Sequence, residues 1–141
     1  MIIEKTKFQG KEIVFETLCN ENFEQMKQVF FQCFPTSKHT YDYEQALKDP
    51  NYATYILVTL NGTPCGITGY YTYGQNNKDA FMGWFGVIPS FRRLGLGNFI
   101  FDWTAEKVKS LGYDFFRLCT DIYTSQEALN FYRKKGLYEE K

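Results

Sequence analysis

The sequence has one histidine and no closely spaced cysteines, and this excludes the common zinc sites of proteins. His39 is the single histidine, and the four cysteines, Cys19, Cys33, Cys65 and Cys119, lie far apart in the chain. Structural zinc sites take their ligands from cysteine and histidine pairs that are only a few residues apart. We therefore expect no metal site. We assign His39 to a polar surface loop, with part of a wall around the acceptor substrate as the alternative.

An excess of charge and a long apolar run are also missing. The 141 residues include 16 basic and 16 acidic side chains, so the net charge is zero, which argues against a nucleic-acid partner. No apolar stretch approaches the length of a membrane-spanning helix, and Met1–Lys5 is charged and alternating, unlike a signal peptide. These absences predict a cytoplasmic protein with reduced thiols and no membrane partner.

The length and composition predict a single domain over residues 1–141. Chains of this size usually form one core, and 44% of the residues are hydrophobic, which is sufficient to build it. Aromatic residues reach 19%, which suits either a dense core or an aromatic-lined pocket.

A glycine-rich stretch, Val87–Asn98, lacks the features of two common nucleotide-binding loops. Gly95 and Gly97 begin a dinucleotide fingerprint, but Ile100 stands where its third glycine belongs. No Gly-Lys-Ser/Thr follows, so the stretch is not a P-loop either. A nucleotide-binding oxidoreductase is therefore disfavoured.

The same stretch has the features of an anion site at the start of a helix. An apolar run precedes it, and an amphipathic run, Leu96–Leu111, follows it. The two glycines permit positive φ and a close approach of the backbone. Backbone N–H groups at a helix start attract negative charge, and Arg92 and Arg93 add fixed positive charge. The predicted ligand carries phosphate, in the form of a pyrophosphate.

Residue patterns along the rest of the chain predict an α/β domain with a mixed sheet. The expected strands span residues 2–8, 12–18, 52–60, 65–73, 81–88 and 113–120, and the expected helices span residues 21–34, 42–49, 96–111 and 126–135. Strand 81–88 is almost continuously apolar, which predicts a central strand covered on both faces. Asn20, Asp42 and the box Thr124–Glu127 are the expected helix caps. The order strand–helix–strand from residue 81 onward predicts a parallel strand pair.

Two motifs together resemble those of a known family. Arg92–Gly97 reads Arg-x-x-Gly-x-Gly after a Val-x-Pro lead, and Ser125–Leu137 reads Ser-x-x-Ala-x-x-x-Tyr-x-x-x-Gly-Leu. In this order they resemble the GCN5-related N-acetyltransferases (GNAT), over roughly Tyr52 to Leu137. The family usually has asparagine where this sequence has Ser125, and phenylalanine where it has Leu137. A serine can still donate a hydrogen bond to the pantetheine part of the cosubstrate.

The resemblance implies a fold, a cosubstrate and a reaction. The fold is a GNAT-like mixed, mainly antiparallel sheet with a splayed parallel strand pair and flanking helices. Acetyl-coenzyme A enters the gap between these strands, and a primary amine of a small molecule or peptide takes the acetyl group directly. Tyr132 matches the family tyrosine that protonates the leaving thiolate. The residues that the resemblance assigns to coenzyme A are Phe85, Val87, Arg92, Arg93, Leu94, Gly95, Leu96, Gly97, Asn98 and Ser125.

Several features stay open. The strand before the loop carries no acid after Asp79, so Asp79, Asp42, Glu44, Tyr70 and a chain of waters are all candidates for the general base. The aromatic side chains Tyr71, Tyr73, Phe81 and Trp84 line an acceptor cleft or form cross-strand packing pairs. The resemblance implies two more strands after the second motif, and in this sequence, which stops at Lys141, they are expected to be short or missing. The sheet edge that they leave open, beyond strand 113–120, is expected to be covered by the extra N-terminal strand 2–8 or by a second subunit in a homodimer. The alternative function is a non-catalytic acyl-coenzyme A sensor or partner-binding module.

Overall fold

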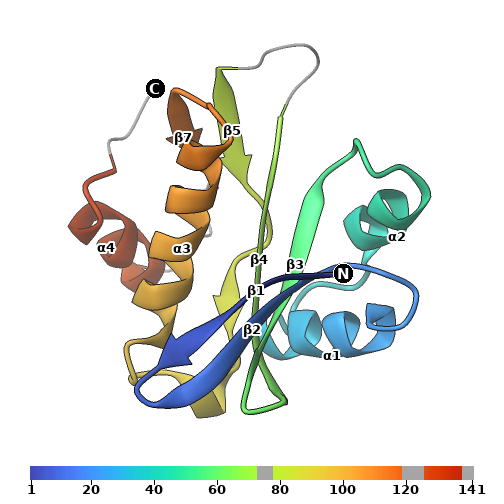
Figure 1. Ribbon diagram of the computed structural model, residues 1–141, viewed down its shortest axis with the longest axis horizontal. Helices are drawn as coiled ribbons and strands as arrows, with labels where there is room; N and C mark the ends of the chain where they lie inside the picture. Colours follow the sequence, from blue (N-terminus) through green and yellow to red (C-terminus); the bar gives the residue numbers. More distant parts are fainter. Residues whose placement is uncertain (73–77, 119–125, 138–141) are drawn as a thin grey trace.

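One seven-stranded sheet with helices on both faces makes up the fold of the computed structural model, which describes residues 1–72, 78–118 and 126–137 (Figure 1). The strands are β1 (Ile2–Phe8), β2 (Lys11–Thr17), β3 (Thr54–Leu60), β4 (Thr63–Tyr71), β5 (Asp79–Met82), β6 (Gly86–Val87) and β7 (Phe115–Arg117). The helices are α1 (Phe23–Cys33), α2 (Tyr41–Lys48), α3 (Leu96–Ser110) and α4 (Gln126–Lys134), with a short 3₁₀ turn at Pro89–Phe91. Helices α1 and α2 lie on one side of the sheet, and α3 and α4 lie on the other (Figure 1).

The first two strands form the expected hairpin at one edge of the sheet. Gln9 and Gly10 both have positive φ, 50° and 80°, as a two-residue turn of this kind requires. Phe8 packs edge-on against Phe99 of α3, with ring centroids 5.1 Å apart. The strand order is β1-β2-β3-β4-β5-β7, so β1 and β7 lie at opposite ends. The expectation that strand 2–8 covers the edge beyond residues 113–120 was therefore wrong.

Strand β3 is buried on both faces, as is the middle of β4, whereas residues 83–86 of the expected central strand are only partly buried. Ile56 and Val58 belong to the core under α3, while Tyr55 and Leu57 belong to the core under α1 and α2. Successive side chains of a strand point to opposite faces, so a strand between two helical layers buries all of them. The two cores therefore meet at β3, in the middle of the sheet.

The expected strand 81–88 is interrupted at residues 83–85, just before the part of it that borders the candidate site. Tyr70 of β4 lies opposite Met82, and Ile67 lies opposite Gly86, so two residues of β4 face the three residues 83–85. One extra residue on one strand is a β-bulge, which bends that strand and ends regular pairing. The bulge divides the apolar run into β5 and β6. Both pieces still pair with β4.

The parallel pair is present and short. Asp79, Ala80 and Phe81 of β5 lie opposite residues 115–117 of β7, in parallel register. Within the described residues β7 pairs with β5 alone, while β6 beyond the bulge pairs with β4 alone. Among the described residues, the edge of β6 that faces away from β4 is unpaired, and this edge forms the opening of the sheet.

Two helix caps differ from the predictions. Asn22, not Asn20, precedes α1, and its side chain accepts the N–H of Cys19 at 2.8 Å instead of capping the helix. Asp42 lies inside the first turn of α2, which is preceded by Thr40. The predicted cap residues Thr124 and Ser125 of α4 lie outside the described part of the chain.

Helix α3 has the expected start, but its buried face differs from the expectation. Leu96 and Ile100 are buried as expected, whereas Leu111 is 50% exposed just beyond the helix end. Phe101 and Val108, on another side of α3, are also buried, because α4 and β7 pack there. Helix α3 is therefore covered on more than the single stripe that the periodicity indicated.

Candidate active site

The free edge of β6 directs backbone groups into the opening of the sheet. The N–H of Ile88 donates to the carbonyl of Cys65 in β4, at 2.9 Å. Because successive residues of a strand point their amides in opposite directions, the N–H and C=O of Val87 point away from β4. The Val87 carbonyl accepts the Nε–H of Arg92 at 2.9 Å. The Val87 N–H points to the side of β6 opposite β4, which is unpaired in the described residues.

The loop between β6 and α3 follows the predicted strand–turn–helix course. Arg93 and Gly95 have positive φ, 68° and 84°, and Gly95 is the residue before the first turn of α3. This conformation turns the chain sharply, so that the first N–H groups of α3 come beside β6. Leu96 is buried, so only its backbone is available to a ligand, whereas Arg93 and Leu94 are exposed.

Gly97 leaves space at the point where the loop, β6 and α4 meet. A Cβ atom at this position would lie 3.9 Å from Cγ2 of Val87 and 4.0 Å from Cε2 of Phe131, which are ordinary contacts. The fold itself therefore tolerates a small side chain here. The open space beside the N–H groups of the first turn is what a bound anion would use.

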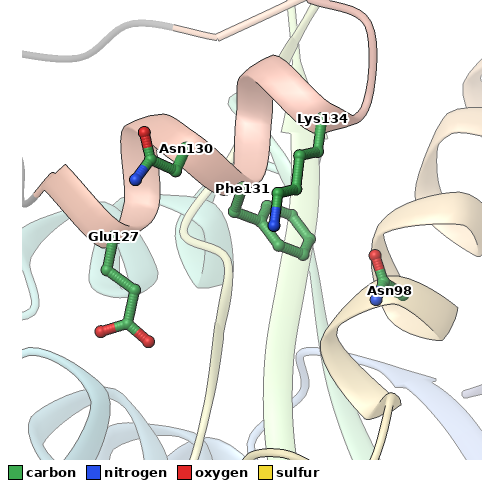
Figure 2. A pocket seen from close by; sticks show the side chains of 5 residues that line it. All are labelled: Asn98, Glu127, Asn130, Phe131 and Lys134. Carbon is green, nitrogen blue, oxygen red and sulfur yellow. The ribbon is translucent and has the colours of Figure 1, made fainter.

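A hollow of about 530 Å³ lies between the start of α3 and the exposed side of α4. Asn98 contributes from α3, and Glu127, Asn130, Phe131 and Lys134 contribute from α4 (Figure 2). Asn98 was expected to bind the ligand, whereas the four residues of α4 were not identified from the sequence. These four residues are three, one and three positions apart, which places them on one face of a helix. This spacing could have identified them from the sequence.

Tyr132 lies in an aromatic cluster between α4 and α3. Its ring centroid is 6.3 Å from that of Phe101 and 5.6 Å from that of Phe131. Burial in this cluster raises the pKa of the Tyr132 phenol above its usual value. The phenol is therefore protonated at neutral pH and is able to donate a proton. Lys135 holds α4 against α3 through an ion pair with Asp102, at 2.6 Å.

Phe85 connects the bulge to α4. Its ring stacks on that of Phe131, with centroids 5.8 Å apart and an interplanar angle of 28°. The structure thus brings Phe85, Val87, the loop 92–98 and α4 together around the opening of the sheet. Ser125, the remaining expected residue, lies outside the described residues.

The candidates for the general base have different surroundings. Asp79 forms an ion pair with Arg117 across the parallel strands, at 3.4 Å. Asp42 accepts the indole N–H of Trp84 at 3.0 Å and the hydroxyl of Tyr52 at 2.5 Å. Glu44 is exposed. Tyr70 is partly buried, and this burial raises its pKa.

Both an acceptor cleft and cross-strand packing were open for four aromatic side chains, and the three that the structure describes are packed against other rings. Tyr71 and Phe81 lie opposite each other in β4 and β5, and their rings stack 5.6 Å apart. Trp84 packs edge-on against Phe30 of α1 and against Phe34, the residue after this helix, at 5.0 Å and 5.1 Å. The prediction of a cross-strand packing pair is therefore confirmed for Tyr71 and Phe81. Tyr73 lies outside the described residues.

Neither a group of metal ligands nor a membrane-spanning helix is present in the described residues. In residues 1–72, 78–118 and 126–137 no three histidine, cysteine or acidic side chains are grouped as metal ligands would be. None of the helices in these ranges combines the length and apolarity that crossing a membrane requires.

Comparison with known proteins gives a family and a set of related folds. The model of the acetyltransferase (GNAT) family matches residues 20–137. The aminoglycoside N-acetyltransferase AAC(6')-Iy, solved with CoA, superposes with a TM-score of 0.74 at 15% identity, covering 96% of this chain and 94% of that one. A possible acetyltransferase from Clostridium difficile has the same TM-score and identity, with 92% of each chain covered. Arabidopsis thaliana Naa50, solved with a bisubstrate analogue, gives a TM-score of 0.69 at 16% identity, covering 88% of this chain and 82% of that one. No curated protein matches the sequence.

Proposed function

Because the chain belongs to the acetyltransferase (GNAT) family, we propose that it transfers an acetyl group directly from acetyl-coenzyme A to a primary amine. The observation that supports this most is the free edge of β6, which lies next to the first turn of α3 and the space at Gly97. A long, thin ligand with amides and a pyrophosphate matches these two features.

The proposed binding mode assigns each part of coenzyme A to one feature. The pyrophosphate takes the N–H groups of the loop 92–98, with Arg92 supplying positive charge. The pantetheine amides pair with the edge of β6 at Phe85–Val87, as an added strand would. The hollow between α3 and α4 lies beside this path, and Lys134 offers it a second positive charge. The proposal also includes a hydrogen bond between Ser125 and the pantetheine, which the resemblance to the family implies.

The proposed chemistry needs few protein groups. The neutral amine attacks the acetyl carbonyl, a C–N bond forms, and the C–S bond breaks. The N–H of Val87, directed into the opening, stabilises the negative charge that develops on the carbonyl oxygen. Tyr132 donates its proton to the departing thiolate and recovers one from the protonated amine through solvent. Holding the two reactants together supplies much of the rate, so an identified base is not essential.

The test has a binding arm and a turnover arm. In the first, calorimetry measures coenzyme A binding to the wild type, Gly97→Ala and Gly97→Val. The added methyl of alanine fits the fold, so we expect a folded protein with at least about tenfold weaker binding, and no detectable binding for valine. Circular dichroism checks that both variants are folded. Unchanged affinity in folded Gly97→Val would contradict the pyrophosphate assignment.

In the second arm, acetyl-coenzyme A is incubated with a panel of small amines and peptides, and the free thiol is measured. Thiol release that depends on an amine supports the transferase. Tight binding of coenzyme A without thiol release across the panel would favour the alternative, a non-catalytic acyl-coenzyme A sensor.

A further inference from the structure

We propose that Asp42 binds a second, positively charged amino group of the acceptor, so that the preferred substrates are diamines or polyamines. The proposal rests on the proposed acetyl transfer and extends it to the class of acceptor. Asp42 was considered above only as a base. Its position and contacts suit a different role.

Asp42 lies next to the bulge that creates the opening of the sheet. It belongs to the first turn of α2, and its carboxylate accepts the indole N–H of Trp84, the middle residue of 83–85. Trp84 is followed by Phe85 and β6, where the acetyl group is proposed to lie. The carboxylate is thus separated from the reacting strand by an indole ring. This separation suits an amino group remote from the one that reacts.

Among the described residues, no cation of the protein balances the negative charge of Asp42. Its two hydrogen-bond donors, Tyr52 and Trp84, are neutral. Across the residues that the structure describes, no lysine or arginine forms an ion pair with this side chain. Each carboxylate oxygen accepts more than one hydrogen bond, so both retain capacity for an ammonium group.

The surroundings of Asp42 favour a cation further. The side chain is partly buried, so its attraction for a cation is screened less by water than that of an exposed carboxylate. The hydroxyl of Tyr43, on the same helix, is buried without a hydrogen-bond partner in the described structure. Burial chiefly, and also the charge of Asp42, raises the pKa of both Tyr43 and Tyr55.

The experiment compares two amines of equal length. Cadaverine carries an ammonium group at each end of its carbon chain, whereas pentylamine carries one. Both are titrated into the protein of residues 1–141 in the presence of coenzyme A, with calorimetry and tryptophan fluorescence as readouts. We expect cadaverine to bind about tenfold more tightly, as a half-buried charge pair allows. This advantage should shrink at high salt, because part of it is screened Coulomb attraction.

Two variants and a control locate the effect. Asp42→Asn keeps a hydrogen-bond acceptor and removes the charge, so cadaverine should fall to within about twofold of pentylamine. Tyr52→Phe removes one donor and keeps the charge, so the preference should persist. Glu24→Gln removes an exposed acid of α1, away from the site, and should change the binding of neither amine. In turnover, Asp42→Asn should raise KM for cadaverine about tenfold and leave kcat and the KM for pentylamine nearly unchanged.

The outcomes separate this inference from the proposed function. Equal binding of the two amines to the wild type, which needs no variant to fold, would overturn the role of Asp42. An equal loss for both amines in Asp42→Asn would also overturn it and would assign Asp42 to the packing of Trp84. A cadaverine preference without any thiol release would contradict the proposed acetyl transfer instead.

Discussion

Arg92 combines two roles at the scale of a single residue. Its side chain donates to the carbonyl of Val87, and its charge lies beside the loop that is proposed to bind pyrophosphate. The motif predicted the charge, because arginine next to a glycine-rich helix start favours an anion. The hydrogen bond could not be predicted, since it depends on how the turn Pro89–Phe91 brings the chain back over β6. A sequence motif thus identified the residue but only part of its function.

Tyr132→Phe tests the proposed proton donor. The substitution keeps the ring in its cluster with Phe101 and Phe131 and removes only the hydroxyl. We expect coenzyme A affinity to change little and kcat to fall by about 10²-fold, the usual share of general-acid catalysis. The loss should appear in kcat because the proton moves only in the transition state. Steady-state kinetics with a working acceptor, and calorimetry with coenzyme A, measure the two effects.

The pH dependence of the same step has a defined sign. A general acid works only while it is protonated, and burial raises the pKa of Tyr132. Deprotonation of Tyr132 should lower kcat at alkaline pH. This decrease should occur above pH 10, the ordinary pKa of a tyrosine. Tyr113→Phe, in the turn after α3, is the control and should behave like the wild type. Wild-type kcat in Tyr132→Phe would make this tyrosine a packing residue.

The bulge at 83–85 shows what sequence patterns reveal at the scale of elements. The apolar run predicted a strand correctly, yet apolarity alone does not show where a strand has one residue more than its partner. The extra residue is defined by the pairing with β4, which is a tertiary contact. Gly83 and Gly86 were the local signal, because glycine inside an apolar strand often marks a bulge or a close approach. At Gly86 the close approach is to α1.

Gly86→Ala tests that approach. A Cβ atom at Gly86 would lie 2.9 Å from Cβ and 3.0 Å from Sγ of Cys33, which is closer than such atoms pack. Helix α1 or β6 must then shift, so we expect the free energy of unfolding to fall by about 1–3 kcal/mol. Urea unfolding measures the change. Gly97→Ala is the matched control, because its Cβ meets only ordinary contacts. Equal free energies of unfolding for the two variants would show that α1 moves away from Gly86 without loss of stability.

For the whole molecule, the sequence predicted the order of elements better than their arrangement. The hairpin, the antiparallel meander and the parallel pair all follow from local periodicity and turns, and all are present. The position of β1, opposite to β7, could not be predicted, because pairing of distant edges leaves no local pattern. The hollow between α3 and α4 was missed for a similar reason. It depends on how α4 packs through Phe131 and Lys135, which bring residues far apart in sequence together.

The stability of the whole protein should fall steeply at alkaline pH. Burial raises the pKa of the thiols of Cys33 and Cys65 to about 11 and about 12. In the unfolded chain a thiol ionises near pH 8.5. Above that pH the unfolded state therefore releases protons that the folded state still holds, and unfolding becomes more favourable as pH rises. The contribution is fully present below about pH 8.5 and is lost as pH rises toward the folded values.

Urea unfolding at a series of pH values from about 7.5 to 10.5 checks this slope. Buried tyrosines, among them Tyr43 and Tyr55, have raised pKa values and add to it at the upper end of the range. Cys65→Val replaces a fully buried thiol by an apolar side chain and removes one titrating group. Its stability should consequently fall less steeply between pH 8.5 and 10.5 than that of the wild type. Parallel curves for the two proteins would mean that the thiol of Cys65 reaches solvent before the chain unfolds.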